Sequence, residues 1–123
     1  MNNLIKISVL ITTLFLGFMD VSAATVEQET QHLLNYMANS GCTFIRNGTE
    51  YSSEEARSHI QRKYNYVKNK VNSTEQVIEY AATESSFSGK PYSINCPGKP
   101  VIPSAEWLTK ELLIYRSSVL VGK

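Results

Sequence analysis

Chemically reactive side chains of this sequence include a histidine and two cations in two separate segments. His59 and Lys63 are four residues apart, so in a helix they lie side by side. Both border the apolar stripe of that helix, where the pair could point into a cleft and meet an anion. Arg46 lies in another segment, and its planar guanidinium suits a carboxylate or a phosphate. The alternative for each is an ordinary exposed surface residue.

A third candidate is the segment "SSFSGKPYSINC", which runs from Ser85 to Cys96. "SGK" resembles the end of a phosphate-binding loop, but the leading glycine is missing and Pro91 stands where a serine or threonine should bind magnesium. Gly89 and Pro91 are explained by a turn and an extended approach to a strand. Ser85, Ser86 and Ser88 can be explained as the end of a helix, which leaves Lys90 and Tyr92 without a structural explanation.

The sequence offers little support for catalysis. It contains neither "GxSxG" nor "HExxH", and its single aspartate, Asp20, lies in the N-terminal segment. His32 falls among polar neighbours and is expected to be exposed. We therefore assign no catalytic residue, no metal and no cofactor. A hydrolase remains the weakest alternative, since it needs His59 within about 3 Å of a serine of the Ser85–Ser88 group.

The N-terminus has the pattern of a secretory signal peptide. "MNNLIK" carries one lysine, "ISVLITTLFLGF" is an apolar run, and small residues allow cleavage after Ala23 or Ala24. A membrane anchor is the alternative, but a span needs about 20 apolar residues. We expect a signal peptide over residues 1–23, one domain over 24–123, and a periplasmic or secreted protein without stable membrane insertion. The net charge of +1 gives no field for nucleic acid.

Two cysteines, Cys42 and Cys96, would then lie in an oxidising compartment, where a pair usually forms a disulfide. Closing this loop stabilises a fold by about 4 kcal/mol on the chain-entropy model. A metal pair or a catalytic thiol is less favoured, because neither histidine has ligand spacing with the cysteines.

Patterns of capping and turn residues predict the elements that position the candidates. Helices are expected from a Thr25 cap to a stop at Gly41, from a Ser52 cap to about Lys70, and from Ser73 to about 84–86. Asn47–Gly48 predicts a hairpin with strands at 43–46 and 49–51, and "PYSINC" predicts a third strand. Residues 97–103 read as a loop, Ser104 as the cap of a last helix, and 117–123 as helix or strand. The predicted class is α+β, mostly α, with about four helices, a small hairpin or sheet and one disulfide.

Three stretches carry a resemblance to a known family: "CTFIRNGTEYSSEEARSHIQRKY", "NSTEQVIEYAATESSFSGKPYSI" and "SAEWLTKEL". Together they resemble the YfeK-like family of small exported bacterial proteins, domain of unknown function family 5329. The resemblance implies a bacterial envelope location and no particular activity. Some relatives lack the cysteine pair, which implies that the disulfide is an additional stabilising cross-link rather than part of a chemistry common to the family. The recurring polar positions of the family match Arg46, Asn47, Gly48, His59, Lys63, Ser85, Ser86, Ser88, Gly89, Lys90, Pro91 and Tyr92.

The leading hypothesis is a non-enzymatic binding module, provided that these residues converge. Arg46, Lys63 and Lys90 would hold an anionic group, while His59, Tyr92 and the serines would supply hydrogen bonds. The ligand would be a small carboxylate or phosphate, an envelope glycan, or an acidic segment of an envelope protein. The alternative is a structural or protein-interaction domain in which the same side chains lock the loops.

Overall fold

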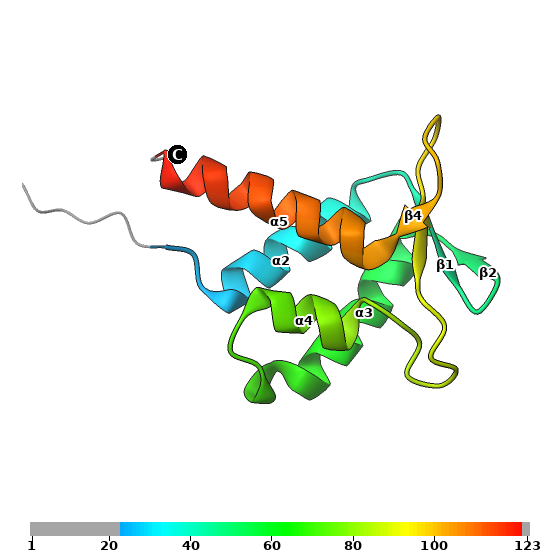
Figure 1. Cartoon of the computed structure of the whole chain (residues 1–123), viewed down its shortest axis with the longest axis horizontal. Coiled ribbons are helices and arrows are strands. Elements are labelled where there is room, and N and C mark those ends of the chain that lie inside the picture. The colour runs from blue at the N-terminus through cyan, green and yellow to red at the C-terminus, as the bar shows by residue number, and fades with distance from the viewer. Residues whose placement is uncertain (1–22, 122–123) are drawn as a thin grey trace, which may run out of the picture.

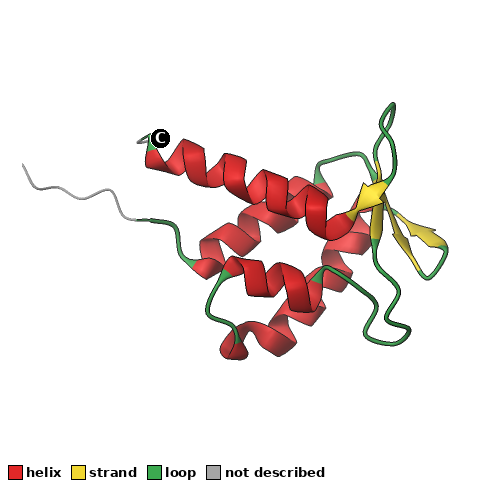
Figure 2. Cartoon of the chain, in the orientation of Figure 1, coloured by secondary structure: helices red, strands yellow, loops and turns green. Residues whose placement is uncertain are grey.

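The computed structural model describes residues 23–121, and the predicted signal peptide therefore lies almost entirely outside the described residues. Within this range four helices stand beside a small antiparallel sheet (Figures 1 and 2). This is the predicted α+β class. The helices are α2 (Val26–Ala38), α3 (Ser53–Val67), α4 (Thr74–Ala81) and α5 (Ser104–Leu120), with a 3-10 turn η1 (Lys68–Lys70). The strands are β1 (Thr43–Arg46), β2 (Thr49–Tyr51), β3 (Ser93–Asn95) and β4 (Ile102–Pro103).

The first two helices of the described range begin at the predicted caps, Thr25 and Ser52, and each cap is part of a capping box. The Thr25 side chain accepts from the Gln28 N–H, and the Gln28 side chain accepts from the Thr25 N–H. Ser52 and Glu55 make the same reciprocal pair at the start of α3. Each box satisfies two backbone donors that a helix N-terminus otherwise leaves unpaired. These local signals fix where the helix carrying His59 and Lys63 begins.

The sheet has the strand order β2-β1-β3-β4. The predicted hairpin is confirmed, with Asn47 (φ 52°) and Gly48 (φ 78°) forming its turn. The predicted third strand pairs with β1, so that Phe44 lies opposite Ile94. Ile102–Pro103, predicted as loop, instead forms the edge strand β4 beside β3. An edge position tolerates a proline, because its missing N–H faces no partner strand.

Two other helix boundaries differ from the prediction. Helix α4 ends at Ala81 rather than near 84–86, and the Thr83 hydroxyl then donates to the Ile78 carbonyl. Ser104 is the first residue of α5 rather than its cap; Pro103 occupies the cap position, and the buried Ser104 hydroxyl has no hydrogen-bond partner in the described range. The ambiguous tail continues α5 to Leu120.

One hydrophobic core joins the helices to one face of the sheet. Phe44 and Ile94 from the sheet and Tyr92 just before it are almost fully buried. The helices contribute the rest of the largest buried side chains, among them Leu34, Met37, Leu108 and Leu112. Within this core α3 packs against β1, and Tyr92 lies beside His59 and Lys63, which determines where the polar candidates meet.

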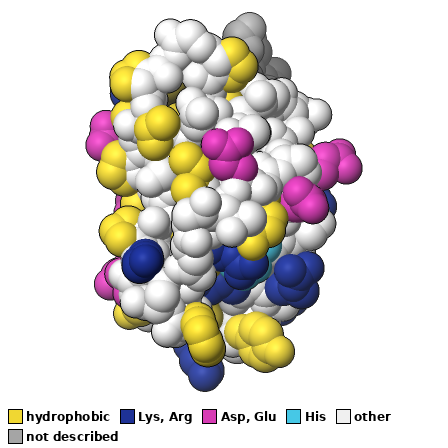
Figure 3. Space-filling view, turned by 90° about the vertical axis from the view of Figure 1, so that its right-hand side faces the viewer, with side chains coloured by type: hydrophobic (Ala, Val, Ile, Leu, Met, Phe, Trp, Pro, Cys, Tyr) yellow, Lys and Arg dark blue, Asp and Glu magenta, His cyan; other side chains and the backbone are white. Residues whose placement is uncertain are grey.

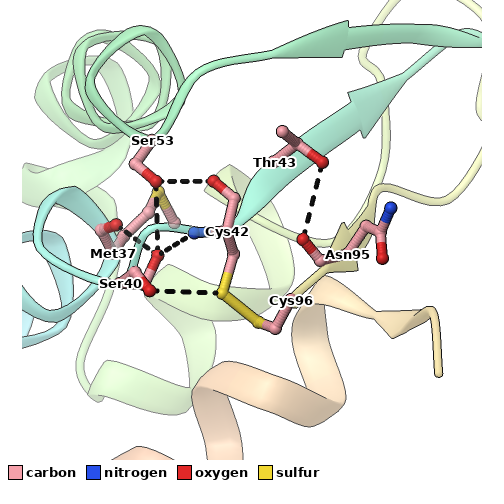
Figure 4. Close-up of a disulfide and its surroundings, with 7 residues drawn as sticks. All are labelled: Met37, Ser40, Cys42, Thr43, Ser53, Asn95 and Cys96. Carbon is pink, nitrogen blue, oxygen red and sulfur yellow. Dashed lines mark hydrogen bonds between the residues drawn. A yellow bond between two sulfur atoms is a disulfide. The ribbon is translucent and has the colours of Figure 1, made fainter. Parts of the chain in front are cut away.

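The predicted disulfide is present: Cys42 and Cys96 are joined by an S–S distance of 2.05 Å (Figure 4). It ties the segment after α2 to the end of β3. The Ser53 hydroxyl donates to the Cys42 carbonyl, and the Cys42 N–H donates to the Ser40 hydroxyl. The bridge therefore lies next to the start of α3, in a well-bonded part of the backbone.

No helix in the described part of the chain is long and apolar enough to cross a membrane.

His32 is less exposed than the sequence suggested. Its Nε2 lies 2.7 Å from a carboxylate oxygen of Glu111 on α5, and its ring stacks on Tyr115 at a centroid distance of 3.9 Å. The contact arises because α2 and α5 pack side by side, which the polar neighbours of His32 in sequence did not reveal.

Candidate functional site

A hydrogen-bond chain links three of the predicted site residues. His59 and Lys63 lie one turn apart on α3, and Tyr92 directly precedes β3. The Tyr92 hydroxyl oxygen is 3.0 Å from Nε2 of His59 and 3.1 Å from Nζ of Lys63. Lys63 also donates to the backbone carbonyl of Glu84 at 2.9 Å. The predicted side-by-side placement of His59 and Lys63 is thus realised around a tyrosine that is only 1% exposed.

Positively charged side chains surround the His59–Tyr92–Lys63 hydrogen-bond chain. Burial, and then the charges of Arg46, Lys63 and Arg62, lower the pKa of His59 from 6.5 to about 4, so its imidazole is neutral at pH 7. Burial also lowers the pKa of Lys63 and raises the pKa of Tyr92. Among residues 23–121, ion pairs involve Arg116 and His32, and none joins these three cations to a carboxylate. The positive charge around His59 is therefore not neutralised by ion pairing.

An open pocket of about 450 Å³ lies beside His59, between the start of α3 and the hairpin. Figure 3 shows basic side chains (dark blue) beside a histidine (cyan) on this sheet-end face, with acidic side chains (magenta) nearby. The volume falls in the range of small-molecule sites. Its lining residues are Phe44, Arg46, Tyr51, Glu54, Glu55, Ala56, Ser58, His59 and Arg62.

Arg46 is held at the pocket wall by Tyr51 across the hairpin. Its Nη2 donates to the Tyr51 hydroxyl at 3.0 Å, and its Cζ lies 4.9 Å from the centre of that ring. A guanidinium has five N–H donors in a fixed fork. Since this is its one hydrogen bond within residues 23–121, Arg46 retains donors for a ligand while its orientation is fixed.

The serine segment forms a separate structure. The Ser85 hydroxyl accepts from Asn47 Nδ2 and from the backbone N–H groups of Phe87 and Ser88. The Ser88 hydroxyl in turn donates to Asn47 Oδ1 and accepts from the Lys90 N–H. These contacts lock the 85–90 loop to the hairpin turn.

The predicted site is therefore only partly assembled. Arg46, His59, Lys63 and Tyr92 come together, whereas Ser85 and Ser88 bind the loop backbone and Asn47. Ser86 and Lys90 are exposed, and neither lines the pocket. No hydrogen bond or ion pair holds the Lys90 side chain to another residue in the described range.

Sequence reasoning missed Arg62, which lines the pocket. Arg62 lies three residues after His59 and so on the neighbouring face of the helix, which is the signal that could have identified it. Ser58 and Tyr51 were also missed; Tyr51 faces Phe44 across the hairpin, a relation that the strand register would have supplied.

Among the described residues, neither a His59–serine hydrolase pair nor a metal site is assembled. His59 Nε2 is hydrogen-bonded to Tyr92, and the described residues contain no hydrogen bond between His59 and a serine of the 85–88 group. Likewise, no cluster of three or more histidine, cysteine or acidic residues within the described range could hold a metal ion.

Residues 24–116 match a family model described as a family of unknown function (DUF5329). The chain belongs to this family. It is also 39% identical over 67 residues to "Uncharacterized protein YfeK" of Salmonella typhimurium, a match that spans 54% of this chain and 56% of the relative. No solved structure is significantly similar. The YfeK-like family resemblance of the sequence motifs is thereby confirmed, and in this family member the hydrogen-bond chain and the pocket are the chemically distinctive features.

Proposed function

We propose that this YfeK-like chain is an exported bacterial envelope protein that binds an anionic group in the pocket beside His59. The observation that carries the proposal is that Arg46 and Arg62 line the pocket beside a neutral His59. Lys63 lies one turn further along the helix. Glu54 and Glu55 also line the pocket, but within residues 23–121 no ion pair joins a carboxylate to any of the three cations. Unpaired positive charge in a concave site favours an anion. Lys90, which the sequence placed in the same site, is not required.

Export is proposed on two features. The N-terminal 23 residues have the charge and apolar pattern of a cleaved signal peptide. The Cys42–Cys96 disulfide is compatible with an oxidising compartment. Edman sequencing of the protein recovered from the periplasm tests this proposal: a start at Ala24 or Thr25 supports it, and an intact N-terminus in the cytosolic fraction contradicts it.

Thermal unfolding of the oxidised protein with anions tests the binding proposal. Inorganic phosphate, sulfate, citrate and an acidic peptide would be compared at constant ionic strength, which separates binding from general salt effects. At a tenfold excess over Kd, one site stabilises the fold by about 1.4 kcal/mol. We expect Arg46→Gln and Arg62→Gln to abolish this shift. Arg57→Gln, on the same helix but outside the pocket lining, is the matched control and should retain it.

A structural role for the same residues is the second candidate, favoured by the Lys63 bond to the Glu84 carbonyl. It expects Lys63→Met to lower the free energy of unfolding while no anion stabilises the wild type. A ligand shift lost in Arg46→Gln and Arg62→Gln, but kept in Arg57→Gln, contradicts a purely structural role.

A further inference from the structure

The hydrogen bonds around Tyr92 determine where the proton of the His59 ring lies. A lysine ammonium donates hydrogen bonds and cannot accept them. Lys63 Nζ, at 3.1 Å, therefore donates to the Tyr92 hydroxyl oxygen. That hydroxyl has one proton, and the other polar group in contact with it is Nε2 of His59 at 3.0 Å. All three groups are satisfied when Tyr92 donates its proton to Nε2.

A neutral imidazole has one protonated and one unprotonated nitrogen. If Nε2 accepts from Tyr92, the ring proton lies on Nδ1. Within residues 23–121 no hydrogen bond occupies Nδ1, and His59 lines the pocket. The ring then offers a ligand an N–H donor, not a lone pair.

We propose that Lys63 and Tyr92 act as positioning residues that hold His59 in the Nδ1–H form, so that His59, Arg46 and Arg62 present only donors to the tetrahedral oxyanion of a phosphate or sulfate ligand. This inference rests on the proposed anion-binding function and specifies the chemistry of the bound group. A sulfate or a phosphate monoester dianion has only acceptors to offer, and inorganic phosphate at pH 7 presents unprotonated oxygens beside its P–OH groups, which matches such a set of donors. A lone pair on Nδ1 would instead repel it.

Acidic residues also line the pocket, and Glu55 lies one helical turn before His59 on the same side of α3. Glu54 and Glu55 belong to the first turn of α3, and Glu55 precedes His59 by about 6 Å along the helix axis. One Glu55 carboxylate oxygen is also occupied by the Ser52 N–H in the capping box. The capping box thus draws the Glu55 carboxylate back toward Ser52 and away from His59.

The tautomer can be measured without any ligand. Long-range ¹H–¹⁵N correlation spectra of the oxidised, ¹⁵N-labelled protein at pH 7 distinguish the two ring nitrogens, with His59→Gln identifying the signal and His32 as an internal reference. We expect wild-type His59 to be protonated on Nδ1. Tyr92→Phe removes only the hydroxyl and should release the ring to a mixture of both forms. Tyr66→Phe removes an exposed hydroxyl from α3, the helix that carries His59, and should leave the tautomer unchanged.

Phosphate and sulfate titrations of the wild type, Tyr92→Phe and Tyr66→Phe then test the consequence for binding. Because only the Nδ1–H form is competent, Kd should rise by the reciprocal of its remaining fraction. A fraction of one fifth in Tyr92→Phe thus predicts about fivefold weaker binding. Tyr66→Phe should bind as the wild type does.

The outcomes separate this inference from the function on which it rests. Protonation of Nε2 in the wild type overturns the inference, whether or not anions bind. An unchanged phosphate and sulfate Kd in Tyr92→Phe, despite a redistributed tautomer, also overturns it. Absence of anion binding in a wild type with the Nδ1–H ring overturns the proposed function, while the hydrogen-bond assignment stands.

Discussion

Nε2 of His59 and the hydroxyl oxygen of Tyr92 lie 3.0 Å apart, and this contact joins the helix α3 to the segment that enters β3. It places a titratable ring between a buried phenol and a pocket wall that also holds Arg46 and Arg62. The imidazole ring is thus hydrogen-bonded to Tyr92, and His59 also lines the pocket.

The first prediction concerns pH. His59 has a pKa of about 4 when folded and about 6.5 when unfolded, so the unfolded state binds more protons between these values. Its contribution to stability is complete above pH 6.5 and is lost as the pH falls toward 4. Urea unfolding across this range should show that loss, and His59→Gln should flatten it between pH 6.5 and 5. A wild-type His59 that titrates near 6.5 by NMR contradicts the prediction.

A second prediction separates Lys90 from Ser85. The Lys90 side chain is exposed, whereas the buried Ser85 hydroxyl accepts three hydrogen bonds. We expect Lys90→Ala to change the free energy of unfolding by less than about 0.5 kcal/mol, as at other surface sites. Ser85→Ala removes the shared acceptor of these part-buried hydrogen bonds and should cost about 1 kcal/mol. Comparable losses in both variants would show that the lysine also fastens the loop.

The third prediction concerns the ion-pair network at the other end of the helices. Arg116 of α5 bridges Glu29, which is 6% exposed, and Glu75, with N–O distances of 2.8 and 2.7 Å. Hydrogen bonding to Arg116 lowers the pKa of both carboxyls. Arg116→Met leaves the Glu29 charge buried and should cost about 3 kcal/mol.

A double-mutant cycle checks the origin of that cost. Glu29→Gln combined with Arg116→Met should be less destabilising than the two single losses added together, because neither partner is left charged and unpaired. Strict additivity in urea unfolding would rule out a coupled pair. Arg57→Met provides a control for removing a helical arginine outside this network.

The fourth prediction concerns the disulfide. Cys42 and Cys96 are 54 residues apart. Removing a disulfide that closes a loop of this length lowers the free energy of unfolding by about 4 kcal/mol on the chain-entropy model. Cys42→Ala with Cys96→Ala should therefore unfold at much lower urea. The core is formed by the helices and the sheet, so far-UV circular dichroism of the folded variant should match the wild type. A changed spectrum in the absence of urea would mean that the bridge is needed to form the fold.

The local elements were predictable because their signals lie within a few residues of one another. The capping boxes of Thr25 and Ser52 and the Asn47–Gly48 turn each need only short-range backbone geometry, and each was found where the sequence placed it. Ile102–Pro103 was missed as a strand, because its pairing with β3 depends on a partner in another segment.

The same distinction applies to the candidate site. From the sequence alone, helical spacing determined that His59 and Lys63 are neighbours, and chemistry determined that Arg46 suits an anion. Only the tertiary structure decided that Tyr92 joins the pair and that Arg62 lines the pocket, while Lys90 and the serines of the 85–88 group do not. The physical reason is that these relations depend on how α3 packs against β1 and the segment that enters β3. That packing is set by burial of the whole core rather than by any local pattern.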